Sequence, residues 1–284
     1  MAGRNRLGAR GAAAGLAARA RVRAVMTLGD RCAGLAAALL RRPSYQDRLR
    51  MLIERHAPGH SFVDVGCMWN VDGTYAFHAL DQGAVRVTGI DVQGATERFH
   101  TENRRRGSRV AFVEGDINDP TLPERLGRFD VVFCSGVLYH MPNPLTTLEQ
   151  LRALCGRTLI LGSATIPEQG IPQLALYYPF LDARFHRKLV PRIDWVKFGL
   201  DTTFRHDWYY ANWFWGLTPS CAQAMLRTVG FEVQEVHNWR RALCVVCAPR
   251  DRGVAPRVRY YDEPTQRSRR GAASRRRHRS AAPW

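Results

Sequence analysis

Three acidic residues follow short β-rich stretches of the chain, and their spacing suits recognition of a nucleoside. Asp64 and Gly66 end the first stretch, Asp91 ends the second, and Asp116 comes just after the third. In an open α/β sheet, the carboxyl ends of the strands form the edge at which ligands bind. A carboxylate there can accept hydrogen bonds from both ribose hydroxyls, and a glycine lets the backbone approach a ligand closely. Dinucleotide-binding folds share both features, so other residues must discriminate.

The loop after the first stretch lacks the dinucleotide-binding spacing. Residues 66–73 read GCMWNVDG rather than G-x-G-x-x-G, so they lack the close-packed helix N-terminus that holds a pyrophosphate. A later β-rich stretch runs into FCSGVLYHMPNP, which contains Tyr139 and His140. An imidazole that titrates near neutral pH can act as a general base. The alternative role for His140 is a hydrogen bond that shapes the loop.

The β-rich stretches that must position these residues alternate with segments that can form helices. Pro144 and the leucines that follow it predict one such helix over residues 144–155. Short, buried-type strands that alternate with helices are typical of a doubly wound, mostly parallel α/β sheet. The predicted strands are residues 61–65, 85–91, 109–113, 129–134 and 157–162.

This alternation is interrupted after residue 166. Residues 177–215 hold 13 aromatic side chains in 39 positions. Such a density predicts either the hydrophobic core of a lid or a pocket wall that recognises an acceptor. We therefore expect an aromatic-rich insertion over residues 166–215, above the carboxyl edge of the sheet.

The sheet pattern resumes near residue 216. Thr218 and Pro219 predict the N-cap and first turn of a helix that ends at Gly230. Residues 231–236 and 242–248 are then predicted to pair as an antiparallel hairpin, joined by a turn at residues 237–241.

The net charge of +17 belongs to the two ends of the chain. Residues 1–50 contain 11 Arg and two acids, and residues 250–284 contain 11 Arg and three acids. Residues 51–249 hold 20 basic and 20 acidic side chains and are predicted to form a neutral globule. The acid-free start of the chain fits a solvated, partly helical arm, with an organelle transit peptide as the alternative.

Composition excludes several classes of protein. No run of about 18 apolar residues is present, which argues against a membrane-spanning helix. Seven scattered cysteines favour reduced thiols in a cytoplasm. Cys244 and Cys247 have C-x-x-C spacing but lie in an apolar run without a second ligand pair, so we expect buried structural thiols and no metal site.

Taken together, residues 61–165 and 216–248 resemble the class I S-adenosylmethionine-dependent methyltransferases. The stretch FDVVFCSGVLYHMPNP, followed by a leucine-spaced helix, is typical of one broad branch of that family. The branch includes enzymes that alkylate the wobble uridine of transfer RNA and many small-molecule methyltransferases. The stretch NWFWGLTPS, residues 212–220, is also similar. The resemblance implies a Rossmann-like sheet and S-adenosyl-L-methionine as cofactor.

The resemblance also implies roles for individual residues. Asp64 would lie near the cofactor ammonium, Asp91 would bind the ribose hydroxyls, and Asp116 would accept from the adenine amino group. Met68 and Asn70 stand where the family usually has glycine, so Gly73 is the candidate for the close approach. The predicted cofactor-binding residues are Asp64, Gly66, Cys67, Gly73, Asp91, Val92, Asp116, Ile117 and Ser135. The predicted catalytic residues are His140 and Tyr139, and the predicted acceptor-binding residues are Tyr177, Trp213 and Trp215.

The sequence therefore predicts a cytoplasmic methyltransferase that acts on a small or medium-sized organic acceptor, without a metal or a membrane span. A transfer-RNA-modifying enzyme that binds RNA through its basic ends is one alternative, and a non-catalytic cofactor-binding protein is another. The predicted organisation is a basic arm (residues 1–45), a methyltransferase domain (46–165 and 216–249), a lid (166–215) and a disordered Arg-rich tail (250–284).

Overall fold

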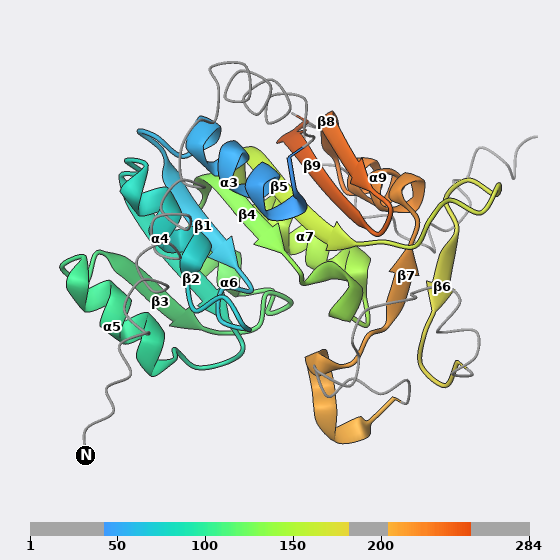
Figure 1. The fold of residues 1–284 in the computed structure, drawn as a ribbon, viewed down its shortest axis with the longest axis horizontal. Helices are drawn as coiled ribbons and strands as arrows, with labels where there is room; N and C mark the ends of the chain where they lie inside the picture. The colour runs from blue at the N-terminus through green and yellow to red at the C-terminus, as the bar shows by residue number, and fades with distance from the viewer. Residues whose placement is uncertain (1–42, 182–203, 251–284) are drawn as a thin grey trace, which may run out of the picture. The chain divides into compact units, whose positions relative to one another are not determined.

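A seven-stranded sheet organises the protein in a computed structural model, which describes residues 43–181 and 204–250 (Figure 1). The strand order is β3-β2-β1-β4-β5-β9-β8. Strands β1 to β5 are parallel, β9 is antiparallel to β5, and β8 is antiparallel to β9. The strands are β1 (Ser61–Val65), β2 (Arg86–Asp91), β3 (Val110–Glu114), β4 (Phe129–Ser135), β5 (Cys155–Ala164), β8 (Phe231–Trp239) and β9 (Ala242–Pro249). The predicted doubly wound, mostly parallel sheet with a terminal antiparallel hairpin is confirmed.

The register of the parallel strands brings their carboxyl ends to one edge. Val65 at the end of β1 lies opposite Ile90 of β2 and Cys134 of β4. Asp91 at the end of β2 lies opposite Glu114 at the end of β3. The loops that follow these strands therefore meet at the same edge, which is where open α/β sheets bind ligands.

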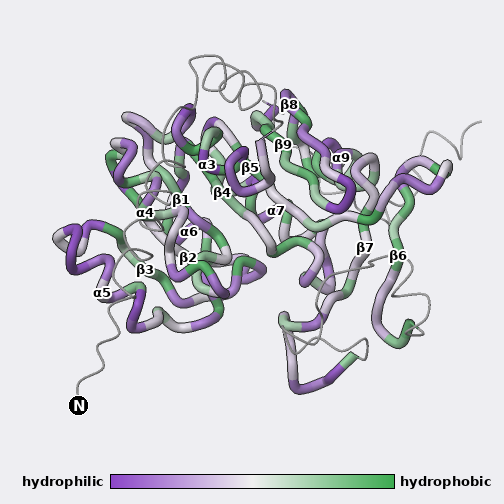
Figure 2. Tube along the Cα trace, in the orientation of Figure 1, coloured by the Kyte–Doolittle hydropathy of each residue, from purple (hydrophilic) through white to green (hydrophobic). Residues whose placement is uncertain are grey.

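Helices cover both faces of this sheet, and α4 and α7 lie on opposite sides of the strands in Figure 1. The apolar faces of α7 and α9 share one core with β1, where Leu148, Leu151 and Leu226 are completely buried. Because both faces are covered, β4 and β5 are buried at most of their positions and contain the apolar runs 131–134 and 159–161 (Figure 2). The helices are α3 (Tyr45–His56), α4 (Thr74–Asp81), α5 (Glu97–Arg105), α6 (Leu122–Leu126), α7 (Pro144–Leu154) and α9 (Pro219–Thr228).

Local sequence signals account for α7, which precedes β5, and for α9, which precedes β8. Pro144 occupies the first turn of α7, where its missing N–H costs no intrahelical hydrogen bond. The Thr218 side chain caps α9 by accepting from the N–H of Cys221, and Gly230 follows α9 with φ +92°. The predicted start and end of α9 agree with these caps.

The C-terminal hairpin differs from its prediction in one respect. Strand β8 continues to Trp239, so the turn contains only Arg240 and Arg241 rather than residues 237–241. Exposed residues of β8 alternate with half-buried ones along an outer strand of the described sheet, and many of them are polar, so in sequence this stretch resembles a loop. The prediction that Cys244 and Cys247 are buried is consistent with their zero exposure in β9.

A second, two-stranded antiparallel sheet lies within the aromatic-rich region. Strand β6 (Ala175–Tyr177) pairs with β7 (Trp215–Leu217), and the 3-10 turn η2 (His206–Ala211) precedes β7. The predicted arm over residues 1–42, the tail over residues 251–284 and the middle of the insertion, residues 182–203, lie outside the described residues. None of the helices within the described ranges combines the length and the apolar character that a bilayer crossing demands.

Candidate cofactor and active site

The loop between β1 and α4 depends on two glycines. Gly66 has φ +80° and Gly73 has φ +76°, a backbone region that favours glycine. A Cβ at Gly66 would overlap Cγ2 of Val137, and a Cβ at Gly73 would lie 2.5 Å from the ring of Phe99. Both positions therefore require glycine for close packing as well as for conformation. Gly73 makes its close approach to α5, through Phe99.

Two non-glycine residues in this loop also adopt left-handed backbone conformations. Asn70 has φ 57° and Asp72 has φ 45°, and both residue types tolerate this region better than most. The Asp72 carboxylate accepts from the hydroxyl of Thr96 at 2.8 Å and pairs with Arg98 at 3.5 Å. Because Thr96 is the N-cap of α5, these contacts tie the loop to that helix.

Asp91 joins the same loop to the end of β2. One carboxylate oxygen accepts from the N–H of Met68 at 2.7 Å, and the other accepts from the N–H of Gln93 at 2.8 Å. Burial raises the pKa of Asp91, and these backbone donors oppose the rise. The side chain is thus held in a fixed orientation at the edge of the sheet, while the next residue, Val92, is 49% exposed.

Asp64 lies deeper than Asp91. Its carboxyl is 1% exposed and accepts from the N–H of Ala76 in the first turn of α4 at 3.1 Å. Burial raises the pKa of Asp64 to about 8, so the carboxyl is mostly protonated at pH 7. Cys67 is also fully buried, and its sulfur packs against Gly89, where a Cβ would lie 2.7 Å from it. Burial raises the pKa of the Cys67 thiol as well.

The loop after β3 places Asp116 beside a residue of the aromatic-rich region. The hydroxyl of Tyr210 in η2 donates to one oxygen of Asp116, at 2.5 Å, and the N–H of Asn118 donates to the other at 2.8 Å. Ile117, between them, is 5% exposed and packs in the main core. Its side chain is therefore structural, which leaves its backbone as the group that could face a ligand.

The loop after β4 brings Tyr139 and His140 to the same edge. Ser135 ends β4 half-buried, and the turn η1 (Leu138–His140) follows. Nδ1 of His140 lies 2.8 Å from the carbonyl oxygen of Asn212. Since a carbonyl only accepts, this contact assigns the proton to Nδ1 and leaves a lone pair on Nε2. Burial lowers the pKa of His140 to about 4 and raises the pKa of Tyr139 to about 12, so both are neutral at pH 7.

The structure separates the three predicted acceptor-binding residues into two groups. Trp213 joins the predicted catalytic residues, with its ring centroid 4.2 Å from that of Tyr139 and 5.7 Å from that of His140. Trp215 and Tyr177 pair across β6 and β7 with ring centroids 5.1 Å apart, and Tyr177 is 51% exposed. The indole N–H of Trp215 donates to the carbonyl of Pro142 at 3.1 Å, so this pair also borders the loop after β4.

Three residues that the sequence analysis did not select complete this arrangement. Asn212 is 4% exposed, and its side-chain amide bonds the backbone of Arg205 and Tyr209. Tyr210 and Asn118 add the contacts to Asp116 described above. Asn212 begins the stretch NWFWGLTPS that was singled out, whereas Tyr210 lies 94 residues from Asp116 and carries no local signal.

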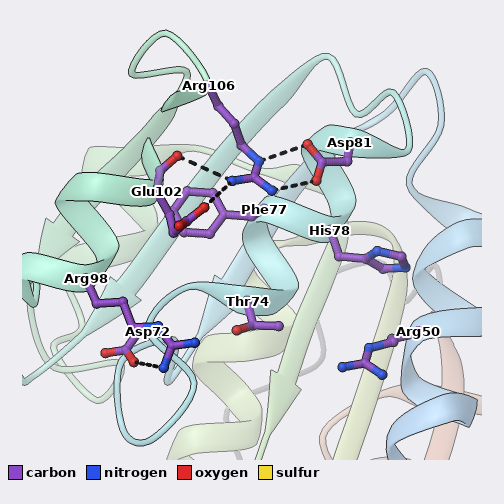
Figure 3. Close-up of a pocket in the computed structure, with 9 residues that line it drawn as sticks. All are labelled: Arg50, Asp72, Thr74, Phe77, His78, Asp81, Arg98, Glu102 and Arg106. Atoms are coloured by element: carbon purple, nitrogen blue, oxygen red, sulfur yellow. Dashed lines mark hydrogen bonds and ion pairs between the residues drawn. The ribbon is translucent and has the colours of Figure 1, made fainter. Parts of the chain in front are cut away.

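A charged surface pocket of about 290 Å³ lies on the helical side of the glycine loop (Figure 3). Arg106 makes a two-pronged contact with Asp81 and pairs with Glu102, and Arg98 pairs with Asp72 (Figure 3). These charges neutralise one another, so we interpret the pocket as the surface of an ion-pair network over α4 and α5. Its lining is completed by Arg50, Thr74, Phe77 and His78. Within the described ranges, His, Cys and acidic side chains do not gather into groups that could hold a metal ion.

Comparison with known proteins supports a methyltransferase domain. Residues 62–157 match the family model described as a methyltransferase domain. A tRNA U34 carboxymethyltransferase from Nautilia profundicola is 34% identical over 147 residues, which is 48% of this chain and 45% of that protein. A ubiquinone biosynthesis O-methyltransferase from Vibrio campbellii is 32% identical over 97 residues, which is 34% of this chain and 39% of that protein. The chain thus spans less than half the length of these curated relatives.

The fold is also similar to that of a solved structure. The 1,6-didemethyltoxoflavin-N1-methyltransferase of Burkholderia thailandensis, with bound 1,6-didemethyltoxoflavin and S-adenosylhomocysteine, has a TM-score of 0.52 and 17% identity. The match covers 87% of this chain and 93% of that protein. The family model thus identifies residues 62–157 as a methyltransferase domain, and the solved structure shows a likeness of fold.

Proposed function

We propose that the protein transfers a methyl group from S-adenosyl-L-methionine to a small or medium-sized organic acceptor. The observation that carries the proposal is the pair of acids, Asp91 and Asp116, held by backbone N–H groups at neighbouring strand ends beside the Gly66 loop. A nucleoside needs such acceptors at two separated points, one for its sugar hydroxyls and one for its base amino group. The geometry fits the adenosine half of the cofactor.

Each cofactor-binding residue has a defined task in this proposal. Asp91 accepts from the ribose hydroxyls with the lone pairs that Met68 and Gln93 leave available. Asp116 accepts from the adenine amino group. Asp64 supplies the carboxyl beneath the loop for the ammonium end, directly or through water. The backbones of Gly66, Cys67, Gly73, Val92, Ile117 and Ser135 shape the remaining wall.

The neutral cluster of Tyr139, His140 and Trp213 forms the acceptor side of the proposed site. S-adenosylmethionine supplies an already electrophilic methyl group, so the residues here mainly align the acceptor and exclude water. With its proton on Nδ1, His140 offers Nε2 to a proton that the acceptor loses. A pKa of about 4 makes it a weak base, which suits an acceptor whose proton is acidic or leaves late.

The aromatic-rich region supplies the cover of this site in our proposal. The N–H of Phe214 donates to the carbonyl of Tyr139 at 2.9 Å, and the carbonyl oxygen of Asn212 accepts a hydrogen bond from Nδ1 of His140. The described parts of residues 166–215 thus contact the loop after β4 at several points. This supports a role for the insertion in acceptor recognition, with Trp213 inside the cover and Tyr177 and Trp215 at its rim.

Transfer RNA is the second candidate acceptor, because the curated relative with 34% identity is named a tRNA U34 carboxymethyltransferase. The Arg-rich ends would suit RNA phosphates. Residues 51–249 have balanced charge, however, and several described arginines of α5 and its surroundings are paired with acids. This balance favours the small acceptor. The six described cysteines are buried and form no disulfides with one another, which supports a cytoplasmic location.

Two measurements test the proposal. Calorimetry of the full chain with S-adenosylhomocysteine should show binding, and a protein that does not bind would support a non-enzymatic role instead. Mass spectrometry of metabolites and of digested RNA from a strain lacking the protein then identifies the acceptor. Loss of a methylated small metabolite is expected, and loss of a modified nucleoside would establish the RNA alternative.

A further inference from the structure

Tyr210 makes the contact between the aromatic-rich region and Asp116. Its hydroxyl donates to one oxygen of Asp116, while the N–H of Asn118 donates to the other at 2.8 Å. The Asn118 side-chain amide also lies 3.4 Å from the Tyr210 hydroxyl. The Asp116 carboxylate is therefore held at both oxygens, from two parts of the chain that are 94 residues apart.

The partners of Tyr210 are themselves fixed by α7. The hydroxyl of Thr147, which is fully buried, donates to the side-chain oxygen of Asn118 at 2.7 Å. The Asn118 amide also lies 3.4 Å from the sulfur of Met141. Because the amide oxygen is taken by Thr147, the amide nitrogen must face Tyr210, and this gives the tyrosine hydroxyl a defined position.

The turn that carries Tyr210 is also held rigid. The side chain of Asn212 accepts from the N–H of Arg205 at 2.9 Å and donates to the carbonyls of Arg205 and Tyr209 at 2.8 and 3.0 Å. The carbonyl of Asn212 binds His140. One closed turn, residues 205–212, thus contacts both the predicted adenine end and the predicted acceptor end of the site.

We propose that Tyr210 is a positioning residue that orients the Asp116 carboxylate for the amino group of adenine, an inference that rests on the proposed function. The hydroxyl occupies one lone pair of its oxygen, and a carboxylate has about four such acceptor positions. The carboxylate therefore stays able to accept from adenine while its rotation is prevented. Preorganisation of this kind increases affinity because less freedom is lost when the ligand binds.

The test compares S-adenosylhomocysteine with an analogue that carries hydrogen in place of the adenine amino group. Tyr210→Phe in the full chain removes only the hydroxyl, and we expect it to weaken binding of S-adenosylhomocysteine about two- to tenfold, the worth of one hydrogen bond. Binding of the deamino analogue should not change, so the preference for the amino group should shrink. Tyr209→Phe is the matched control, because Tyr209 is 80% exposed and should preserve wild-type affinity for both compounds.

Several outcomes would overturn the inference. If Tyr210→Phe weakens the binding of both compounds equally, the residue is merely structural. If Tyr210→Phe binds S-adenosylhomocysteine more tightly than the wild type does, the tyrosine hydroxyl competes with adenine for Asp116. Asp116→Asn should reduce the preference for the amino group in the same direction as Tyr210→Phe. If Asp116→Asn does so while Tyr210→Phe does not, the proposed function stands and this inference fails. If the wild type binds neither compound, the proposed function itself is wrong.

Discussion

Replacement of Asp64 by Asn should make the cofactor-free protein more stable, and increasingly so as the pH rises. The carboxyl is 1% exposed, and burial raises its pKa from 3.8 to about 8. Between about pH 4 and 8 the folded protein therefore holds a proton at this site that the unfolded chain has released. Stability contributed by this residue falls as the pH rises through that window.

The magnitude follows from the shift. One pKa unit corresponds to 1.36 kcal/mol, and about three units separate pH 3.8 from pH 7, so the ionisable carboxyl costs about 4 kcal/mol at pH 7. Asn does not titrate, and its side-chain oxygen can still accept from the N–H of Ala76. The stability difference between Asp64→Asn and the wild type should grow by about 3–4 kcal/mol from pH 5 to pH 8.

Urea unfolding of both proteins at pH 5, 6, 7 and 8 measures this difference, and the other titrating groups cancel in the subtraction. Asp130→Asn is the control with the opposite sign, because hydrogen bonds from Ser61 hold the pKa of Asp130 below its usual value. That variant should be less stable than the wild type by the same amount at all four pH values, because the stability from a lowered pKa is fully present above the ordinary value of about 4 and is lost only below it. A stability difference for Asp64→Asn that stays constant with pH would refute the reasoning.

Four further predictions concern the proposed reaction. Asp91→Ala should weaken S-adenosylhomocysteine binding by about 1–3 kcal/mol, which calorimetry would measure, because a charged hydrogen-bond acceptor is removed; unchanged affinity would take this residue out of the site. Gly66→Ala should abolish that binding, since φ is +80° and the new Cβ would overlap Val137. Equilibrium dialysis in which the variant binds as much S-adenosylhomocysteine as the wild type would contradict this. Trp215→Ala should raise the acceptor KM in steady-state kinetics with little change in cofactor affinity, and the opposite pattern would argue against its placement at the rim. The reaction rate should not fall between pH 7 and pH 5 through protonation of His140, because the pKa of that residue is about 4.

The sheet was predictable from sequence because its strands obey local rules. Strands β1, β2, β4 and β5 are buried at most of their positions, and together with β3 they appear as short apolar runs whose positions agree with the predicted ones to within a few residues. Strand β8 was predicted too short, because its outer position leaves Glu232 and Asn238 exposed and its sequence polar. The two-stranded sheet of β6 and β7 was not predicted, since each strand has only three residues.

Some residues of the candidate site could likewise be predicted from local sequence, whereas others depend on long-range contacts. Asp91 and Asp116 follow their strands directly, so the fold alone brings them to one edge. The depth of Asp64 depends on side-chain alternation in β1, where Val63 and Val65 face the core of α7 and the carboxyl faces α4. The contacts of Tyr210 and Asn212 depend on how the aromatic-rich region returns to the sheet, and residue types near them give no sign of it.

The antiparallel pairing of β5 with β9 has a consequence during synthesis of the chain. Leu159, Ile160 and Leu161 in β5 are fully buried, yet their partner strand begins only at Ala242. About 80 residues must leave the ribosome after β5 before β9 can pair with it, which takes roughly 4–16 seconds at about 5–20 residues per second. For that interval the nascent protein presents an apolar strand edge to its surroundings. Chains that stall within residues 165–241 should therefore depend on a chaperone that shields this edge.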